Sequence, residues 1–166
     1  FIGGSTISDQ MEIETFVNNI KKLTKLPVIL FPGNISGVAS NADAILFMSL
    51  LNSDNPYFIT GAQALGSISV KKHNIEPLPT AYLIVGEGSG AAGFVGQARG
   101  IPTDKPEIAG MYALAAEYMG MRFLYLESGS GAKDPIPLKT IQTVRKMYSG
   151  LLMVGGGIKN ESTAKK

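Results

Sequence analysis

Six short runs of apolar and β-branched residues recur along the chain and predict six buried strands. Apolar runs without polar alternation are typical of parallel strands whose two faces are both covered. The runs comprise residues 1–2, 28–31, 44–51, 81–85, 123–126 and 151–154.

Helical patterns separate most of these runs. The clearest amphipathic stripe spans residues 9–23, where Ser8 is placed to cap the first turn. Further helices are predicted from 56 to about 72 and from near Pro137 onward. The predicted buried stripe of the first helix consists of Ile13, Phe16, Val17 and Ile20.

Another helix is predicted over residues 106–119. Asp104 with Glu107 three residues later forms a capping pattern at its start, and Gly120 follows its end. The apolar face expected to be buried consists of Ile108, Met111, Tyr112, Ala115 and Met119.

Alternating strands and helices indicate an α/β fold. Small or polar residues follow all six strands, which is typical of a TIM (β/α)8 barrel, whereas a doubly wound sheet concentrates them at one switch point. The barrel is preferred. Because six strands are visible, the sequence predicts one barrel domain over residues 1–166, truncated at both ends and holding strands 2 to 7.

Composition narrows the possible partners. The net charge is +2, from 15 basic and 13 acidic residues, and no basic run exceeds a pair, so nucleic acid is not predicted as a partner. The longest apolar run, residues 44–51, is too short to cross a bilayer, and no signal segment opens the chain. The chain contains no cysteine. We therefore expect a cytoplasmic protein without a transmembrane segment.

The segment YLESGSG, residues 125–131, carries the most informative chemistry. Glu127 leaves a strand and can accept hydrogen bonds from substrate hydroxyls, while serine hydroxyls and glycine amides can contact phosphate oxygens. One segment can therefore hold both ends of a polyol phosphate. The alternative is a flexible loop with a surface glutamate.

Three consecutive glycines, residues 155–157, follow the last strand. This strand would be the seventh of a complete barrel, and many such barrels bind phosphate after strands seven and eight. Close approach of the backbone to an anion is the favoured interpretation. A tight turn that packs a helix on the barrel is the alternative.

Together these segments resemble archaeal geranylgeranylglyceryl phosphate synthase over nearly the whole chain. The resemblance rests on GGST, LFPGN, LFMSLLNSDNPYFITGAQ, PTAYLIVGEGSGAAGFVG, YALAAEYMGMRFLYLESGSGA and LMVGGGIKN, in the order of the family. It implies a TIM-barrel prenyltransferase that joins sn-glycerol 1-phosphate to geranylgeranyl diphosphate with Mg²⁺. The resemblance assigns the glycerol phosphate contacts to Tyr125, Leu126, Glu127, Ser128, Gly129, Ser130, Gly131, Gly156 and Gly157.

The same resemblance gives two residues a chemical role. Ser5 matches a hydroxyl ligand to Mg²⁺, which prefers oxygen donors. Glu127 orients the attacking glycerol hydroxyl and takes its proton. The family's acidic magnesium ligand after strand one and its Gly-Asn phosphate loop after strand eight are not among these residues.

Two other functions stay open from the residues alone. One is another phosphate-binding barrel enzyme, acting on a phosphorylated sugar or indole, and the other is a non-catalytic phosphate-binding barrel. Segment 90–96, GAAGFVG, either leaves room for a prenyl tail or packs tightly. The aromatic-rich segment 55–63 is a candidate contact surface, and a homo-oligomer is predicted.

Overall fold

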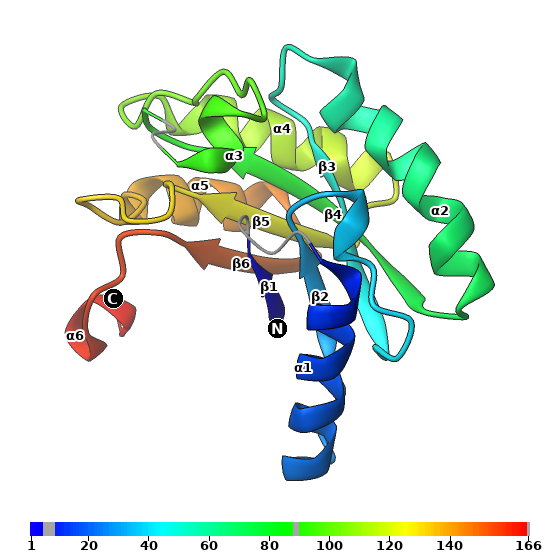
Figure 1. Ribbon diagram of the computed structural model, residues 1–166. Coiled ribbons are helices and arrows are strands. Elements are labelled where there is room, and N and C mark those ends of the chain that lie inside the picture. The colour runs from blue at the N-terminus through cyan, green and yellow to red at the C-terminus, as the bar shows by residue number, and fades with distance from the viewer. Residues whose placement is uncertain (5–8, 88–89, 166) are drawn as a thin grey trace. The chain divides into compact units, whose positions relative to one another are not determined.

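The computed structural model describes residues 1–4, 9–87 and 90–165 (Figure 1). The strands follow one another in the sheet in chain order, and the pairs β1–β2, β2–β3, β4–β5 and β5–β6 are parallel. The predicted α/β alternation is confirmed. The strands are β1 (Ile2–Gly4), β2 (Ile29–Pro32), β3 (Ala44–Leu50), β4 (Glu76–Ile84), β5 (Phe123–Glu127) and β6 (Leu151–Gly155).

The predicted helices are present, with corrected bounds. The second one begins as a π-helical turn, Tyr57–Gly61, before it becomes regular, and the short helix α3 was not predicted. A 3₁₀ turn, Ile35–Gly37, follows β2. The α-helices are α1 (Gln10–Leu23), α2 (Ala62–Lys72), α3 (Ala91–Phe94), α4 (Pro106–Tyr118), α5 (Leu138–Met147) and α6 (Glu161–Ala164).

The chain forms two compact units. The first unit comprises Phe1–Met48 and Thr60–Leu78, and the second comprises Ser49–Ile59 and Pro79–Lys166. Every residue of the glycerol phosphate segment and of the triple glycine belongs to the second unit, so its geometry is set within one body.

In the first unit, α1 contributes Ile13 and Val17 to the core, as predicted. Phe16 was expected in the same stripe but is 51% exposed, because only the narrow centre of the stripe meets the strands. The helix is capped by Asp9, whose carboxylate accepts a hydrogen bond of 2.9 Å from the Met11 amide. Ser8, the predicted cap, lies outside the described residues.

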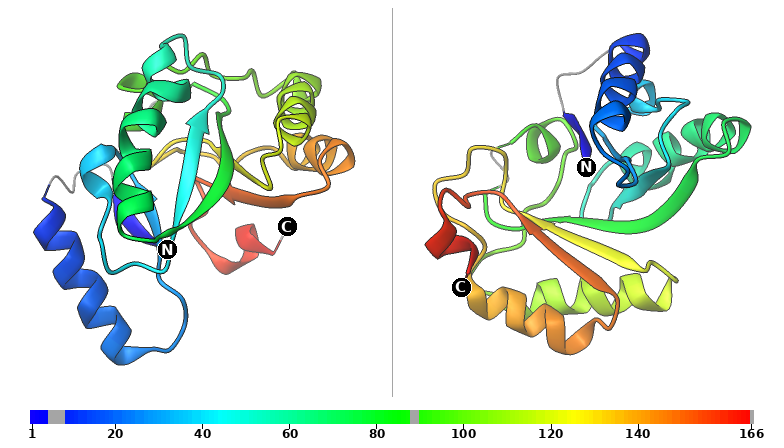
Figure 2. Two further views of the ribbon diagram at one scale, coloured as in Figure 1. Left: turned by 90° about the vertical axis from the view of Figure 1, so that its right-hand side faces the viewer. Right: turned by 90° about the horizontal axis from the view of Figure 1, so that it is seen from below.

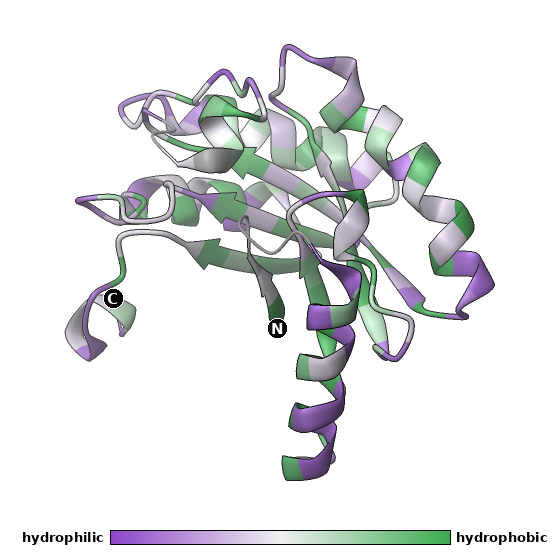
Figure 3. Cartoon of the chain, viewed as in Figure 1, coloured by the Kyte–Doolittle hydropathy of each residue, from purple (hydrophilic) through white to green (hydrophobic). Residues whose placement is uncertain are grey.

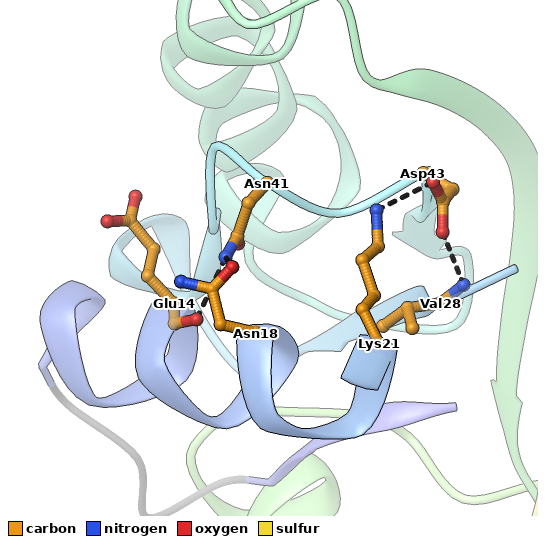
Figure 4. Close-up of polar contacts among 6 residues, drawn as sticks. All are labelled: Glu14, Asn18, Lys21, Val28, Asn41 and Asp43. Atoms are coloured by element: carbon orange, nitrogen blue, oxygen red, sulfur yellow. Dashed lines mark hydrogen bonds and ion pairs between the residues drawn. The ribbon is translucent and has the colours of Figure 1, made fainter. Parts of the chain in front are cut away.

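Polar contacts tie α1 to the segment that precedes β3 (Figure 4). The Lys21 ammonium donates to one Asp43 oxygen at 2.7 Å, and the Val28 amide donates to the other at 2.6 Å. The Asn41 amide donates to the Glu14 carbonyl at 2.8 Å. The hydrogen bonds from Lys21 and then from Val28 hold the pKa of Asp43 below its ordinary value.

In the second unit, α4 and α5 cover the same side of β5 and β6 (Figure 2). Apolar residues fill most of these two strands (Figure 3). The buried core combines strand residues with side chains from both helices. Its members include Leu83, Leu124, Leu126, Ala109, Ala113 and Val144.

The buried face of α4 is only partly the predicted one, because Ile108 and Tyr112 pack against the core as expected but the centre of the face is different. Met111 and Met119 are 65% and 64% exposed, and the small residues of the helix face inward instead. A β-carbon on Gly110 would come within 2.5 Å of the Met147 sulfur of α5. Small side chains therefore let the two helices pack closely, which the search for large apolar residues overlooked. The buried residues of α4 are Pro106, Ala109, Gly110, Ala113 and Ala116.

The predicted cap at the start of α4 is wrong, whereas the predicted glycine at its end is confirmed. Lys105 occupies the cap position and makes no side-chain capping bond, so the pattern of Asp104 and Glu107 does not cap the helix. Gly120 adopts a φ of +80° just after the helix, as a terminating glycine does.

Tyr148, at the end of α5, connects this helix to the segment that precedes β5 in the second unit. Its side chain is almost fully buried, and its hydroxyl donates to the Met121 carbonyl at 2.8 Å. Burial, with the Glu117 carboxylate nearby, raises the pKa of Tyr148 to about 12. This hydroxyl is therefore a permanent donor.

We predict that Asp43→Asn lowers the free energy of unfolding by about 1 kcal/mol at about pH 6, since a half-exposed charged hydrogen bond is lost. Because folding lowers the pKa of Asp43, its contribution is complete above the ordinary value of 3.8 and disappears as the pH falls through the lower folded value. Denaturant unfolding at several pH values measures the difference.

The matched control is Asp104→Asn, at an exposed carboxylate of the loop before α4. It should leave stability within about 0.5 kcal/mol of the parent. A deficit of Asp43→Asn that does not shrink in acid would contradict the electrostatic account.

Candidate active site at the ends of β5 and β6

The site lies on the face of β4–β6 opposite to α4 and α5. Tyr82 of β4 stands beside Tyr125 of β5, and Glu127 stands beside Gly155 of β6. Successive residues of a strand point to opposite faces. Because Leu124 and Leu126 pack in the helix-side core, the two tyrosines and Glu127 share the other face.

Glu127 is held by hydrogen bonds at both carboxylate oxygens. The Gly129 amide donates to Oε1 at 2.7 Å, and the Tyr82 hydroxyl donates to Oε2 at 3.5 Å. Only 9% of the residue is exposed. Glu127 is therefore not the surface glutamate of the alternative interpretation.

The two tyrosines keep their protons. Burial, followed by the charge of Glu127, raises the pKa of Tyr82 and of Tyr125. Their rings lie 5.4 Å apart at an angle of 52°. The carboxylate thus lies beside neutral hydroxyls.

The loop after Glu127 is fixed to the end of β6. The amide and the hydroxyl of Ser128 both donate to the Gly155 carbonyl, at 3.1 Å and 3.4 Å. Gly129 and Gly131 adopt φ values of +109° and +77°, which favour glycine. The loop is therefore a defined turn and not an irregular connection.

A side chain at any of the three consecutive glycines would overlap a different group. A β-carbon on Gly155 would overlap the Tyr125 hydroxyl, and one on Gly156 would overlap the side chains of Ser128 and Glu127. One on Gly157 would overlap the Asp134 backbone. Gly156 and Gly157 also have φ values of +83° and +67°. Tight packing is thus shown, although the packed partner is the β5–α5 loop and not a helix.

Segment 90–96 supports the same loop from the β4 side. A β-carbon on Gly90 would lie 3.0 Å from the Ser130 amide nitrogen and 3.3 Å from the Gly129 α-carbon. Gly96 is buried, and a β-carbon there would overlap Ala92 and Leu50. The segment packs tightly at both glycines, and a path for a prenyl tail along it stays a prediction.

A model of one family, described as the PcrB family, matches residues 1–166. The chain belongs to the PcrB family. Similar proteins include the geranylgeranylglyceryl phosphate synthase of Nitrosopumilus maritimus, 60% identical over 98% of this chain, and that of Pyrococcus horikoshii, 53% identical over 99%. The chain spans 65% of the length of each of these relatives.

Solved structures of this PcrB chain's relatives agree with its fold. The synthase of Thermoplasma acidophilum, in complex with sn-glycerol-1-phosphate, aligns with a TM-score of 0.93 at 39% identity, over 99% of this chain and 67% of its own. The wild-type Thermoplasma volcanium enzyme aligns with a TM-score of 0.93 at 43% identity, over 99% and 66%. The predicted TIM-barrel fold is confirmed.

The structure brings Tyr125, Glu127, Ser128 and Gly129 against the triple glycine. Leu126, also predicted as a contact, faces the other way and packs in the helix-side core. Ser5, the predicted magnesium ligand, lies outside the described residues. Asn52 lies in the turn just after β3 and serves the fold, because its amide donates to the carbonyls of Ile84 and Arg99. Within residues 1–4, 9–87 and 90–165, no helix is long and apolar enough to cross a membrane.

Tyr82 is the residue that the sequence reasoning missed. It lies inside an apolar run, where a tyrosine reads as core. Only the register of β4 against β5 places it beside Tyr125 and within reach of Glu127. One signal was available in the sequence: Tyr82 is a polar residue within an apolar strand, next to a strand that ends in the polar residue Glu127.

We predict that Gly157→Ala destabilises the protein more than Gly120→Ala. Both glycines have a positive φ, but a β-carbon meets nothing within 4 Å at Gly120 and overlaps backbone at Gly157. Backbone strain alone costs about 1 kcal/mol at Gly120. Strain with overlap costs about 2 to 4 kcal/mol at Gly157.

Denaturant unfolding of both variants tests this comparison. Equal losses of unfolding free energy at the two positions would show that the turn is not held against Asp134. Because the substitution acts without ligand, weaker phosphate binding by Gly157→Ala does not by itself prove an anion contact.

Proposed function

We propose that the complete protein is a geranylgeranylglyceryl phosphate synthase, which joins sn-glycerol 1-phosphate to geranylgeranyl diphosphate. The observation that carries the proposal is the buried Glu127 carboxylate, which lies beside two neighbouring tyrosines and accepts a hydrogen bond from a glycine-rich turn. The relatives that match this chain bear that name, and the aligned Thermoplasma acidophilum structure contains sn-glycerol-1-phosphate.

Glu127 would handle the polyol end of the glycerol phosphate. Each carboxylate oxygen accepts more than one hydrogen bond, so both retain capacity for substrate hydroxyls beside their contacts with Tyr82 and Gly129. The attacking hydroxyl oxygen forms a bond to the first carbon of the prenyl chain as the bond to diphosphate breaks. Its proton passes to Glu127.

The glycine turns would hold the phosphate end. Gly129, Gly131, Gly156 and Gly157 all have positive φ, and turns of this kind can direct successive amides toward an anion. The Ser130 hydroxyl is a further donor beside them, and the Ser128 hydroxyl would donate to phosphate by turning away from the Gly155 carbonyl. Two loops that contact each other would thereby share one phosphate.

Mg²⁺ is part of the proposal, with Ser5 as a protein ligand. No group of three or more histidine or acidic residues that could hold a metal occurs in the part of the chain that the structure describes. Mg²⁺ commonly binds through one or two protein oxygens together with substrate phosphates, which suits an incomplete protein site. When bound, it would neutralise the departing diphosphate. A cytoplasmic location and a homo-oligomeric state stay predictions.

The proposal predicts that the complete protein forms the prenyl ether from the two substrates, and that a chelator abolishes the reaction until Mg²⁺ is restored. Glu127→Gln should lower kcat by about a hundredfold or more, because the proton acceptor is lost. It should change the affinity for inorganic phosphate less than about threefold, since Glu127 contacts hydroxyls. Product formation by chromatography and phosphate binding by calorimetry measure these effects.

Other outcomes would decide against the proposal. Consumption of a sugar phosphate in place of the prenyl diphosphate would indicate the alternative barrel enzyme. Binding of sn-glycerol 1-phosphate without turnover would indicate a non-catalytic barrel. Near-normal turnover of Glu127→Gln would remove Glu127 from the mechanism.

A further inference from the structure

Tyr82 does more than fill the core, because its hydroxyl contacts the Glu127 carboxylate. It lies in β4, outside the glycerol phosphate segment, and only 9% of it is exposed. Its hydroxyl donates to Glu127 Oε2, while the Gly129 amide donates to Oε1. The two oxygens of one carboxylate are therefore held from two different elements.

This division fixes the plane of the carboxylate. The Gly129 amide alone would leave the group able to turn about its last side-chain bond, because one hydrogen bond defines one oxygen. A second donor on a paired strand restrains that rotation. We infer that Tyr82 is a positioning residue, which orients Glu127 so that one oxygen faces the attacking glycerol hydroxyl; this inference rests on the proposed function.

The electrostatic environment suits that role. Burial and the charge of Glu127 raise the pKa of Tyr82, so its hydroxyl stays protonated and remains a donor near neutral pH. Tyr125 also faces this carboxylate, and burial followed by the charge of Glu127 raises its pKa as well. Neither tyrosine competes as a proton acceptor for the substrate hydroxyl.

The length of the contact sets the size of the expected effect. At 3.5 Å, the hydrogen bond from Tyr82 is longer than the 2.7 Å bond from Gly129. Hydrogen bonds in active sites are often long without substrate and tighten when it binds. We therefore expect a moderate effect on turnover, of about tenfold, and not the full loss expected for Glu127 itself.

The test is a double-mutant cycle in the complete protein. Tyr82→Phe should lower kcat for prenyl transfer about tenfold, with the KM for geranylgeranyl diphosphate changed less than about twofold. In the Glu127→Gln background, the same substitution should lower kcat less than about twofold further, because the group that Tyr82 orients is already altered.

The matched control is Tyr148→Phe, which also removes one hydroxyl from a buried tyrosine but far from the site. It should lower the thermal midpoint and leave kcat within about twofold. Thermal unfolding of Tyr82→Phe, measured in parallel, verifies that this variant is folded.

The outcomes separate this inference from the proposed function. Unchanged turnover of Tyr82→Phe, or the same fold-loss in both backgrounds, would overturn the role of Tyr82 while Glu127→Gln remains impaired. An inactive parent protein would contradict the proposed function and the inference with it. Normal turnover of Glu127→Gln would remove the residue on which Tyr82 is inferred to act.

Discussion

The site depends on the close approach of two loops, the one after β5 and the one after β6. Residues 155–157 carry no side chains, and a β-carbon at any of them would overlap Tyr125, the Ser128 and Glu127 side chains or the Asp134 backbone. Ser128 donates twice to the Gly155 carbonyl across the same contact. Glycine at all three positions thus lets one strand end lie against the other, which sets the position of Glu127 and of the amides around it.

This packing explains how a carboxylate can be buried here. Removing an ionised carboxylate from water costs several kcal/mol unless hydrogen bonds offset the loss. Glu127 receives one backbone and one tyrosine hydrogen bond. In the proposed function the glycerol hydroxyls would add to these donors when substrate binds.

The sequence predicted the elements better than their contacts. The apolar runs identified the six strands found in the described part of the chain, and Gly120 marked the end of α4. Reading the chain by large apolar residues misplaced the centre of the buried face of α4, because close helix packing favours small residues such as Ala109 and Ala113. The same reading could not separate a core tyrosine from Tyr82.

The candidate site shows the same limit. The pattern of residues at the strand ends and the family resemblance both named Glu127 and the glycines, but only the strand register shows that Glu127 stands beside Gly155 and that Tyr82 reaches its carboxylate. Contacts between residues far apart in the chain follow from register and loop geometry, which no local pattern encodes. The run of glycines predicted tight packing as an alternative, and the fold shows that the packed partners are Tyr125, Glu127 and the loop after β5 in place of a helix.

The central claim is that these two touching loops form one site for the glycerol phosphate. Hydrogen exchange in the complete protein, with and without saturating sn-glycerol 1-phosphate, tests it most directly. The account predicts slower exchange of the amides at 128–131 and 155–157 together, with the amides of α4 unchanged. Protection of only one loop, or of neither while the ligand is bound, would contradict it.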